Sequence, residues 1–247
     1  MKTIFMFLYS IVAYLVGFTA LLFWILSASQ LVPVISIDRT PEISFPLALI
    51  KNISLVLLFG LQHSVMARRP FKQWITKILP QPIERSTYVL ASGIFLAFLT
   101  WQWAPMGGTI WNIPEGSILF YLMYALFFIG WSILFISTFL INHFDLFGLR
   151  QTYFELIKKP YKPLEFRVKA FYKYVRHPLY FGGIVGVWAT PSMSVTHLCF
   201  AILLSGYFII GALFEEKDLT RDFGNEYRDY QKRTAMFIPF SKTNRKI

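Results

Sequence analysis

The stretch Ile118–Ile141 decides the fold class of this chain and reads ILFYLMYALFFIGWSILFISTFLI. It contains no Asp, Glu, Lys or Arg. A helix needs about 20 predominantly apolar residues to cross the hydrocarbon core of a bilayer. The stretch therefore predicts a transmembrane helix and places the chain among membrane proteins.

Comparable apolar segments lie on both sides of this stretch. The sequence predicts further membrane helices at roughly Ile4–Ser27, Ser44–Val65 and Thr87–Ala104. A later apolar region, Leu179–Phe214, is too long for one simple span and is interrupted by Thr190-Pro191-Ser192. Because proline disfavours continuation of the preceding helix, we expect a helical hairpin with a short first arm there. The fold class predicted is all-α integral membrane, with about five membrane helical elements and the last one a hairpin.

The composition agrees with one membrane domain over residues 1–247. Hydrophobic residues make up 55% of the chain and charged residues 15%, and the mean hydropathy is +0.51. Aromatic residues at 19% suit a lipid-facing surface. The single cysteine, Cys199, excludes an intrachain disulfide and a cysteine-based metal cluster. The apolar run at the N-terminus reads as the first membrane helix rather than as a cleavable signal peptide.

The net charge of +11 is gathered in three segments. The loop Ala67–Ser86 is basic, and segments 142–178 and 215–247 hold eight basic residues each. The loop around Ile37 has one basic residue and the loop around Trp111 has none. By the positive-inside rule the three basic segments and the N-terminus are expected to face the cytosol, so the polar side of the bundle faces inward. No continuous basic face is visible, so we expect no nucleic-acid partner.

Ionisable residues fall at the predicted inner ends of these helices. His63 ends the second helix, His143 follows the fourth, and His177 precedes the hairpin. Glu215 and Glu216 end the hairpin on the same side, and His197 lies away from them near its turn. Ionisable groups gathered at one depth of a membrane bundle predict a functional site. A charged helix from Glu215 to Lys232 is expected to pack as a lid over this face.

Two motifs stand beside these residues. The first is Tyr172-x-x-x-Arg176-His177-Pro178-Leu179-Tyr180-x-Gly182-Gly183, in which Pro178 suits the first position of a helix whose free N–H groups can bind a carboxylate. The second is Glu215-Glu216-x-x-Leu219-x-x-x-Phe223-Gly224-x-x-Tyr227-x-x-Tyr230, followed by Ile238-Pro239. Taken alone, each also fits an ordinary helix start at a membrane boundary. Gly182 and Gly186 form a small-x-x-x-small step that allows close helix approach.

The two motifs in this order resemble the isoprenylcysteine carboxyl methyltransferase-like family of integral membrane methyltransferases that use S-adenosylmethionine. Three further segments resemble its methanethiol S-methyltransferase branch, which is also grouped with NnrU-like proteins. These segments are Leu61–Arg68, Glu84–Tyr88 and Asn142–Gln151. The resemblance covers nearly the whole chain. It implies a four-helix membrane part at 1–141 and a cofactor-binding part at 142–247.

The resemblance also implies roles for individual residues. The cofactor would be S-adenosyl-L-methionine, with no metal. Its binding residues would be Leu164, Phe166, Tyr172, Arg176, His177, Pro178, Leu179, Tyr180, Glu215 and Glu216. Prenylcysteine enzymes carry a substrate-binding Arg four residues before the first Glu, where this chain has Gly211. That departure favours an acceptor without an anionic group.

The implied reaction is methyl transfer to methanethiol, which gives dimethyl sulfide. The acceptor is a small thiol that can enter from the bilayer, where membrane lipid is also a partner. Because the thiolate is the nucleophile, a base must take the thiol proton. We expect His143 with Asp145 to be that base, and His63 is the second candidate.

Other functions remain open on the sequence alone. The acceptor can be another small thiol or a lipid-borne one. A non-catalytic membrane accessory protein is an alternative, as the NnrU-like grouping suggests. Haem binding is a third alternative because three histidines share one side, although their positions at helix ends provide no obvious pair of facing axial ligands.

Overall fold

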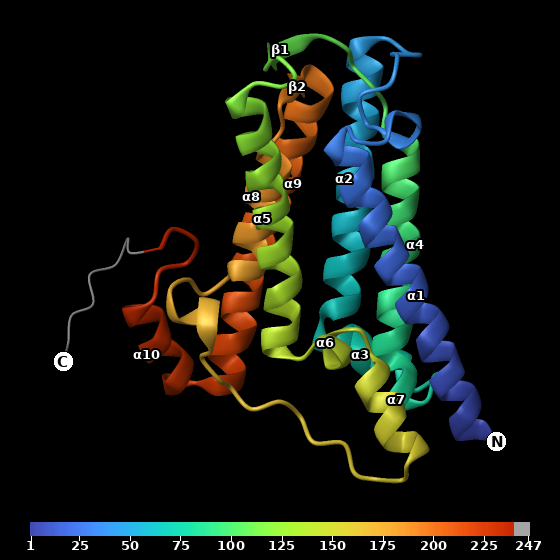
Figure 1. The fold of residues 1–247 in the computed structure, drawn as a ribbon. Helices are drawn as coiled ribbons and strands as arrows, with labels where there is room; N and C mark the ends of the chain where they lie inside the picture. The colour runs from blue at the N-terminus through green and yellow to red at the C-terminus, as the bar shows by residue number, and fades with distance from the viewer. Residues whose placement is uncertain (240–247) are drawn as a thin grey trace. The chain divides into compact units, whose positions relative to one another are not determined.

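The computed structural model describes residues 1–239. Helices form most of this part of the chain, and one two-stranded sheet pairs β1 with β2 (Figure 1). The long helices are α1 Lys2–Ser29, α2 Phe45–Ala67, α4 Glu84–Gln102, α5 Ile118–Ile141 and α9 Val195–Phe223. The shorter elements are α3 Arg69–Ile75, β1 Thr109–Asn112, α6 His143–Leu146, α7 Leu149–Leu156, α8 Pro178–Trp188, β2 Ser192–Ser194 and α10 Asn225–Arg233.

Four of the described helices are long and apolar enough to cross a membrane: α1, α2, α5 and α9. This confirms the predicted all-α membrane fold. The hairpin has the predicted form, because the short α8 ends at Trp188 and α9 begins at Val195 beyond Pro191. The predicted third span, Thr87–Ala104, is found as the helix α4, but α4 is not one of the four.

The chain forms two compact units, each made of separate stretches. Unit 1 comprises residues 1–111, 142–163 and 192–200. Unit 2 comprises residues 112–141, 164–191 and the chain from 201 onward. The predicted boundary at residue 141 does not coincide with this division, because residues 142–163 belong with the first helices and α5 belongs with the later ones.

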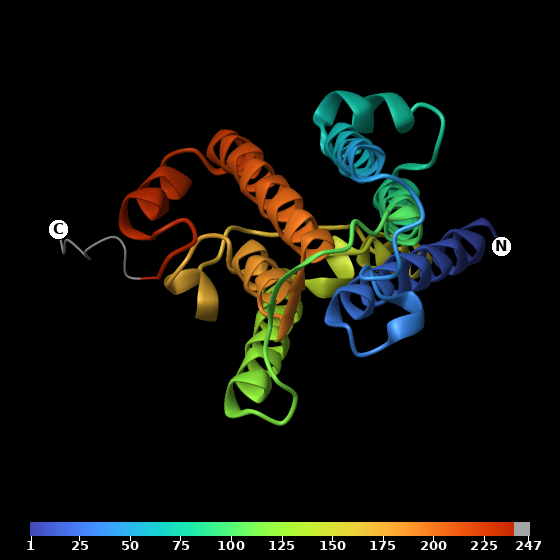
Figure 2. The same ribbon diagram turned by 90° about the horizontal axis from the view of Figure 1, so that it is seen from above.

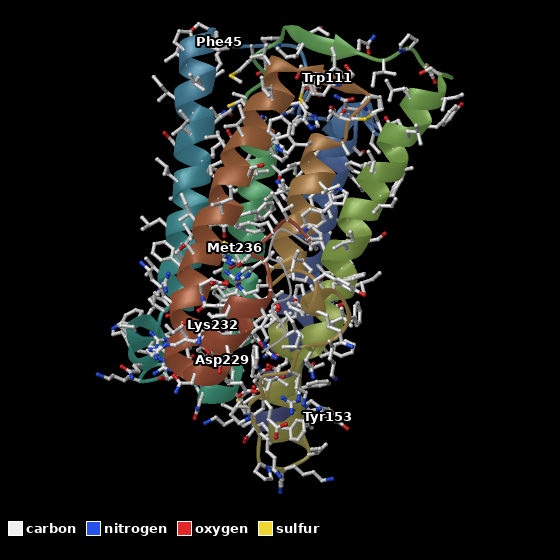
Figure 3. The ribbon with its side chains drawn as sticks, turned by 90° about the vertical axis from the view of Figure 1, so that its left-hand side faces the viewer. Phe45, Trp111, Tyr153, Asp229, Lys232 and Met236 are labelled. Atoms are coloured by element: carbon white, nitrogen blue, oxygen red, sulfur yellow. The ribbon has the colours of Figure 1, made fainter. Side chains whose placement is uncertain are left out.

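In unit 1, α1 packs most closely on α4, and α2 and α7 contact α4 and α1 respectively (Figures 1 and 2). Glycine permits the α1–α4 contact: a Cβ added to Gly93 would lie 2.7 Å from the Cα of Gly17. At one end of the unit, the buried Asn52 side chain exchanges two hydrogen bonds of 2.8 Å with the backbone of Ala104. Phe45 and Trp111 mark that end in Figure 3, and Tyr153 on α7 marks the opposite one.

In unit 2, α5 packs on α8 through glycines from both helices. A Cβ on Gly130 would lie 2.5 Å from the Gly186 nitrogen and 2.8 Å from the Gly182 oxygen. The small-x-x-x-small step at Gly182 and Gly186 therefore makes the predicted close approach. The remaining faces of α5 carry large exposed apolar side chains, as a lipid-facing helix requires: Leu119, Leu122, Leu126, Phe128, Ile129 and Phe139.

The prediction of one charged helix from Glu215 to Lys232 is wrong in one respect. The α9 helix ends at Phe223, and α10 begins at Asn225. Gly224 lies between them with φ of 58°, a conformation that glycine adopts without steric penalty. The chain therefore turns at Gly224, and α10 lies beside the residues that precede α8.

Candidate functional site

The carboxylate of Glu216, on α9 in unit 2, receives five hydrogen bonds. Arg176 donates two of them in bidentate geometry, from Nε at 2.7 Å and from Nη2 at 3.0 Å. His177 Nε2 and the Tyr227 hydroxyl each approach Oε1 to 2.8 Å, and the Gln231 side-chain amide donates to Oε2. The Glu216 side chain is 11% exposed. Its oxygens are therefore occupied by protein donors.

Arg176 also fixes the chain that follows α10. Its Nη1 donates to the Thr234 carbonyl at 2.5 Å and to the Gln231 carbonyl at 3.2 Å. Its backbone N–H donates to Ala235, and that of His177 donates to Met236, which Figure 3 labels. The Arg-His sequence thus holds the segment after α10 against the start of α8. Because the ion pair between Arg176 and Glu216 is buried, loss of either side chain would leave the other as an uncompensated charge. The backbone contacts that Arg176 makes with the segment after α10 would then be weakened as well.

Glu215 differs from Glu216 because its side chain is 42% exposed. Its carboxylate lies 3.6 Å from His177 Nδ1. Burial alone would lower the pKa of His177, but hydrogen bonds and charges from Glu215 and Glu216 outweigh it and raise that pKa above its usual value. Glu215 therefore keeps carboxylate surface that a ligand can reach.

Aromatic side chains form a second layer around these charges. Phe166 packs against Phe223, Tyr227 and Tyr230 with ring centroids 5.3 to 5.6 Å apart. Tyr230 donates a 2.5 Å hydrogen bond to the Tyr172 carbonyl. Burial, followed by the charge of Glu215, raises the pKa of Tyr172, so its phenol stays neutral. Leu164 is half-buried in the irregular segment before this layer.

Pro178 begins α8, with His177 at its N-cap. The first N–H groups of a helix have no carbonyl acceptor within that helix. The backbone N–H groups of Leu179 and Tyr180, which follow Pro178, are therefore suited to bind an anionic group. The Tyr180 ring stacks on His177 with centroids 5.6 Å apart. On α9, a Cβ added to Gly211 would meet only Tyr180, at 3.8 Å. Gly211 thus leaves room beside the Tyr180 hydroxyl.

His143 lies in unit 1 at the start of α6 and is 3% exposed. Its Nε2 shares a 3.1 Å hydrogen bond with the Tyr14 hydroxyl. Phe147, Phe18 and Phe144 place their rings within 6.2 Å of the imidazole. Burial lowers the pKa of His143, which favours the neutral ring that can accept a proton.

Asp145 does not pair with His143, contrary to our expectation. Its carboxylate accepts hydrogen bonds from Arg150 at 2.8 Å and from the Tyr161 hydroxyl at 3.0 Å. Its backbone N–H donates to Asn142 Oδ1, which caps α6. Burial, the charge of Asp145 and the hydrogen bond to it raise the pKa of Tyr161 to about 12. Asp145 therefore organises the chain after His143 and does not orient its imidazole.

His63, on α2, makes hydrogen-bonding contacts with two side chains of α4 in unit 1, Tyr88 and Ser92. Its Nε2 lies 2.5 Å from the Tyr88 hydroxyl and its Nδ1 lies 3.1 Å from Ser92 Oγ. The Arg85 guanidinium lies over the Tyr88 ring, 4.7 Å from its centroid. His63 and His143 thus belong to unit 1 and His177 to unit 2, and the predicted gathering of all three at one level stays a prediction.

His197 lies at the other end of unit 1, as predicted. It lies in the first turn of α9, and its backbone N–H donates to Ser194 Oγ. Its Nδ1 lies 3.8 Å from Asp38, to which Ser194 and Gln30 also donate. Burial would raise the pKa of Asp38, but the nearby imidazole of His197 and the hydrogen bonds from Ser194 and Gln30 outweigh burial and lower that pKa. Within residues 1–239, no group of three or more His, Cys, Asp or Glu is placed to hold a metal ion.

Three residues that complete these clusters were not predicted from the sequence. Gln231 closes the hydrogen-bond set on Glu216, and Tyr14 is the partner of His143. Tyr88 was part of a quoted segment but was not linked to His63. Neither Gln231 nor Tyr14 has a local signal, since each becomes meaningful only through a partner distant in sequence.

The model of the family described as NnrU protein matches residues 53–241. The chain belongs to the NnrU family. This NnrU-family chain is also similar to curated relatives along most of its length. No solved structure matches it.

Two bacterial relatives carry the name methanethiol S-methyltransferase. The protein from Crocosphaera subtropica is 49% identical over 207 residues, which cover 83% of this chain and 80% of the relative. The protein from Mycobacterium tuberculosis is 40% identical over 242 residues, covering 97% and 98%. Nurim from Bos taurus is 26% identical over 178 residues, covering 69% and 68%. Together with its four span-length apolar helices, this membership makes the NnrU-family chain a membrane protein.

Proposed function

We propose that this protein transfers a methyl group from S-adenosyl-L-methionine to methanethiol and releases dimethyl sulfide and S-adenosylhomocysteine. The relatives at 40–49% identity that are named methanethiol S-methyltransferase support the reaction. The observation that carries the donor site is the contrast between Glu216, whose oxygens are occupied, and the half-exposed Glu215 beside it.

The donor fits the residues of unit 2. When bound, it supplies a methyl group on a positively charged sulfur. Glu215 offers a carboxylate, and Tyr180 and Tyr172 offer aromatic rings, which are the groups that attract such a cation. The start of α8 at Pro178 suits the carboxylate of its amino-acid part. Glu216 and Arg176 act through position, because they hold His177 and the residues after α10 around these groups.

The base is assigned to unit 1. We propose that His143 takes the proton from the thiol through its neutral imidazole, with Tyr14 orienting the ring. The thiolate sulfur then forms the new bond to the methyl carbon as the donor carbon–sulfur bond breaks. His63 is the second candidate, held by Tyr88 and Ser92. Asp145 supports the segment after His143 through Arg150.

The glycine at position 211 is consistent with a small uncharged acceptor. The position leaves open space beside Tyr180 and offers no cation for a substrate carboxylate. We propose that the protein lies in the bacterial inner membrane with its basic segments and this site at the cytosolic side. The polar donor would then enter from the cytosol and the apolar thiol from the bilayer.

The test is product detection by gas chromatography with the purified full-length protein, S-adenosylmethionine and a panel of thiols. We expect dimethyl sulfide from methanethiol and little product from bulky thiols. If only larger or lipid-borne thiols gave product, the protein would still be a thiol methyltransferase, but its acceptor would not be methanethiol. Absence of any product and of S-adenosylhomocysteine binding would indicate an accessory protein, and a haem absorption band would indicate the haem alternative.

A further inference from the structure

A groove runs along unit 1 beside the His143 segment. Its volume is about 440 Å³. The apolar lining comes from the first half of α1, from α6 and from α7: Phe7, Ile11, Phe144, Leu149, Tyr153 and Phe154. Phe144 and Tyr153 are more than 45% exposed, and Phe7 packs on Tyr153 with centroids 6.2 Å apart. Figure 3 shows Tyr153 at the end of the unit away from Phe45.

Arg150 supplies the charge of this groove. Its side chain is 20% exposed and its guanidinium lies 5.1 Å from the ring centroids of both Phe154 and Tyr161. One of its N–H groups donates to Asp145, and within residues 1–239 the others have no acceptor. Asn142, at the same groove, adds a polar side chain. Aromatic contacts on both sides hold the guanidinium in place with donors left over.

The size of the groove argues against the acceptor as its occupant. Methanethiol has one carbon and one sulfur, and a single water already takes about 30 Å³ in the liquid. Methanethiol also has no anionic group to use the donors of Arg150. A groove lined by apolar side chains, with the guanidinium of Arg150 beside them, instead fits a long apolar chain joined to an anionic head group.

We propose that this groove binds one anionic phospholipid, with an acyl chain along Phe7, Ile11 and Phe144 and the phosphate on Arg150. Arginine suits phosphate because its planar donors match the phosphate oxygens. The sequence after Arg150 adds Lys158, Lys159 and Lys162 on the same segment, which favours an anionic head over a zwitterionic one. The proposal rests on the membrane location of the protein and is independent of methyl transfer.

The experiment uses the full-length protein in lipid nanodiscs with spin-labelled phosphatidylglycerol or spin-labelled phosphatidylcholine. The measured quantity is the ratio of the two bound fractions by electron paramagnetic resonance. We expect about a fivefold preference for phosphatidylglycerol in the unmodified protein. Arg150→Gln should lower the ratio to near unity, whereas Arg167→Gln, which removes an exposed arginine paired with Glu165, should leave it unchanged.

Two further variants keep the test decisive. Arg150→Gln leaves the charge of Asp145 behind, so Asp145→Asn/Arg150→Gln removes both charges and should also lose the preference. Ile11→Trp fills the groove and should reduce bound phosphatidylglycerol, while Leu8→Trp, on an exposed position of the same helix, should not. Equal binding of the two lipids, a preference that survives both Arg150 variants, or full displacement by inorganic phosphate would overturn the proposal.

Discussion

The polar groups of unit 2 and those of unit 1 are built on opposite principles. Around Glu216, an arginine, a histidine, a tyrosine and a glutamine all donate to one buried carboxylate. Around His143, the Tyr14 hydroxyl meets the imidazole among aromatic rings. The first arrangement ties segments of chain together, and the second leaves a titratable ring in an apolar setting.

This difference separates two kinds of role for residues that are equally prominent in the sequence. A side chain whose hydrogen-bonding capacity is filled by the protein acts by position. A side chain that keeps exposed surface, such as Glu215, can act on a ligand, and the neutral imidazole of His143 can accept a proton. Substitutions at Glu216, His143, Glu215 and His177 test that distinction.

Glu216→Ala should give the largest loss. It leaves the guanidinium of Arg176 buried without its carboxylate, and breaking a buried pair costs about 3–5 kcal/mol. We expect a lower thermal unfolding midpoint in detergent and the loss of S-adenosylhomocysteine binding. The matched control is Glu226→Ala at an exposed position of α10. An unfolding midpoint equal to that of the control would show that Glu216 does not hold the segment after α10.

His143→Ala should lower the turnover number by roughly 10²–10⁴-fold, the usual contribution of a general base. Because the ring is not part of the unit 2 cluster, S-adenosylhomocysteine affinity should stay the same. Rates measured over a pH series should rise toward the wild-type value at high pH, where the thiol ionises by itself. His63→Ala provides the comparison, and normal turnover in His143→Ala would transfer the role of base to His63.

Glu215→Gln should weaken S-adenosylmethionine binding, measured without acceptor, about tenfold, since it removes the carboxylate proposed to face the positively charged sulfur from a half-exposed site. The unfolding midpoint should change little, in contrast to Glu216→Ala. Isothermal calorimetry measures the affinity, and Glu226→Gln is the control for charge loss. An unchanged affinity would remove Glu215 from the donor site.

His177 should cause the smallest effect, a pH dependence of stability. Its folded-state pKa is raised, so the stabilisation by the protonated ring is complete below its unfolded pKa of about 6.5 and is lost as pH rises through the higher folded pKa. The unfolding midpoint should therefore fall over that range. In His177→Gln the same series should be flatter, and parallel curves would assign the slope to another group.

Much of the fold follows from the sequence because its physical signals are local. Apolar length predicts α1, α2 and α5 within a few residues, and Pro191 predicts the hairpin break. The α9 helix instead continues to Phe223, beyond the predicted apolar end at Phe214. The sequence predicted a close helix approach at Gly182 and Gly186 on α8. It did not predict their partner, because Gly130 lies in another helix, α5. The break at Gly224 could be missed because helical spacing continues on both sides of it.

The candidate site was less accessible to sequence reasoning. The motifs identify Arg176, His177, Glu215 and Glu216, but nothing in them tells which glutamate is occupied. Proximity along the chain suggested Asp145 as the partner of His143, whereas tertiary contact gives that role to Tyr14. Side-chain direction at the end of a helix depends on neighbours from distant segments, and one sequence does not reveal those neighbours.

The most direct test of the account is methyl transfer from S-adenosylmethionine deuterated at its methyl group. The purified full-length protein would be incubated with this donor and methanethiol, and the headspace analysed by mass spectrometry. The account predicts dimethyl sulfide that carries the intact deuterated methyl group, with the yield strongly reduced in His143→Ala and in Glu215→Gln at limiting donor. Folded protein that binds S-adenosylhomocysteine yet yields no labelled dimethyl sulfide would contradict it.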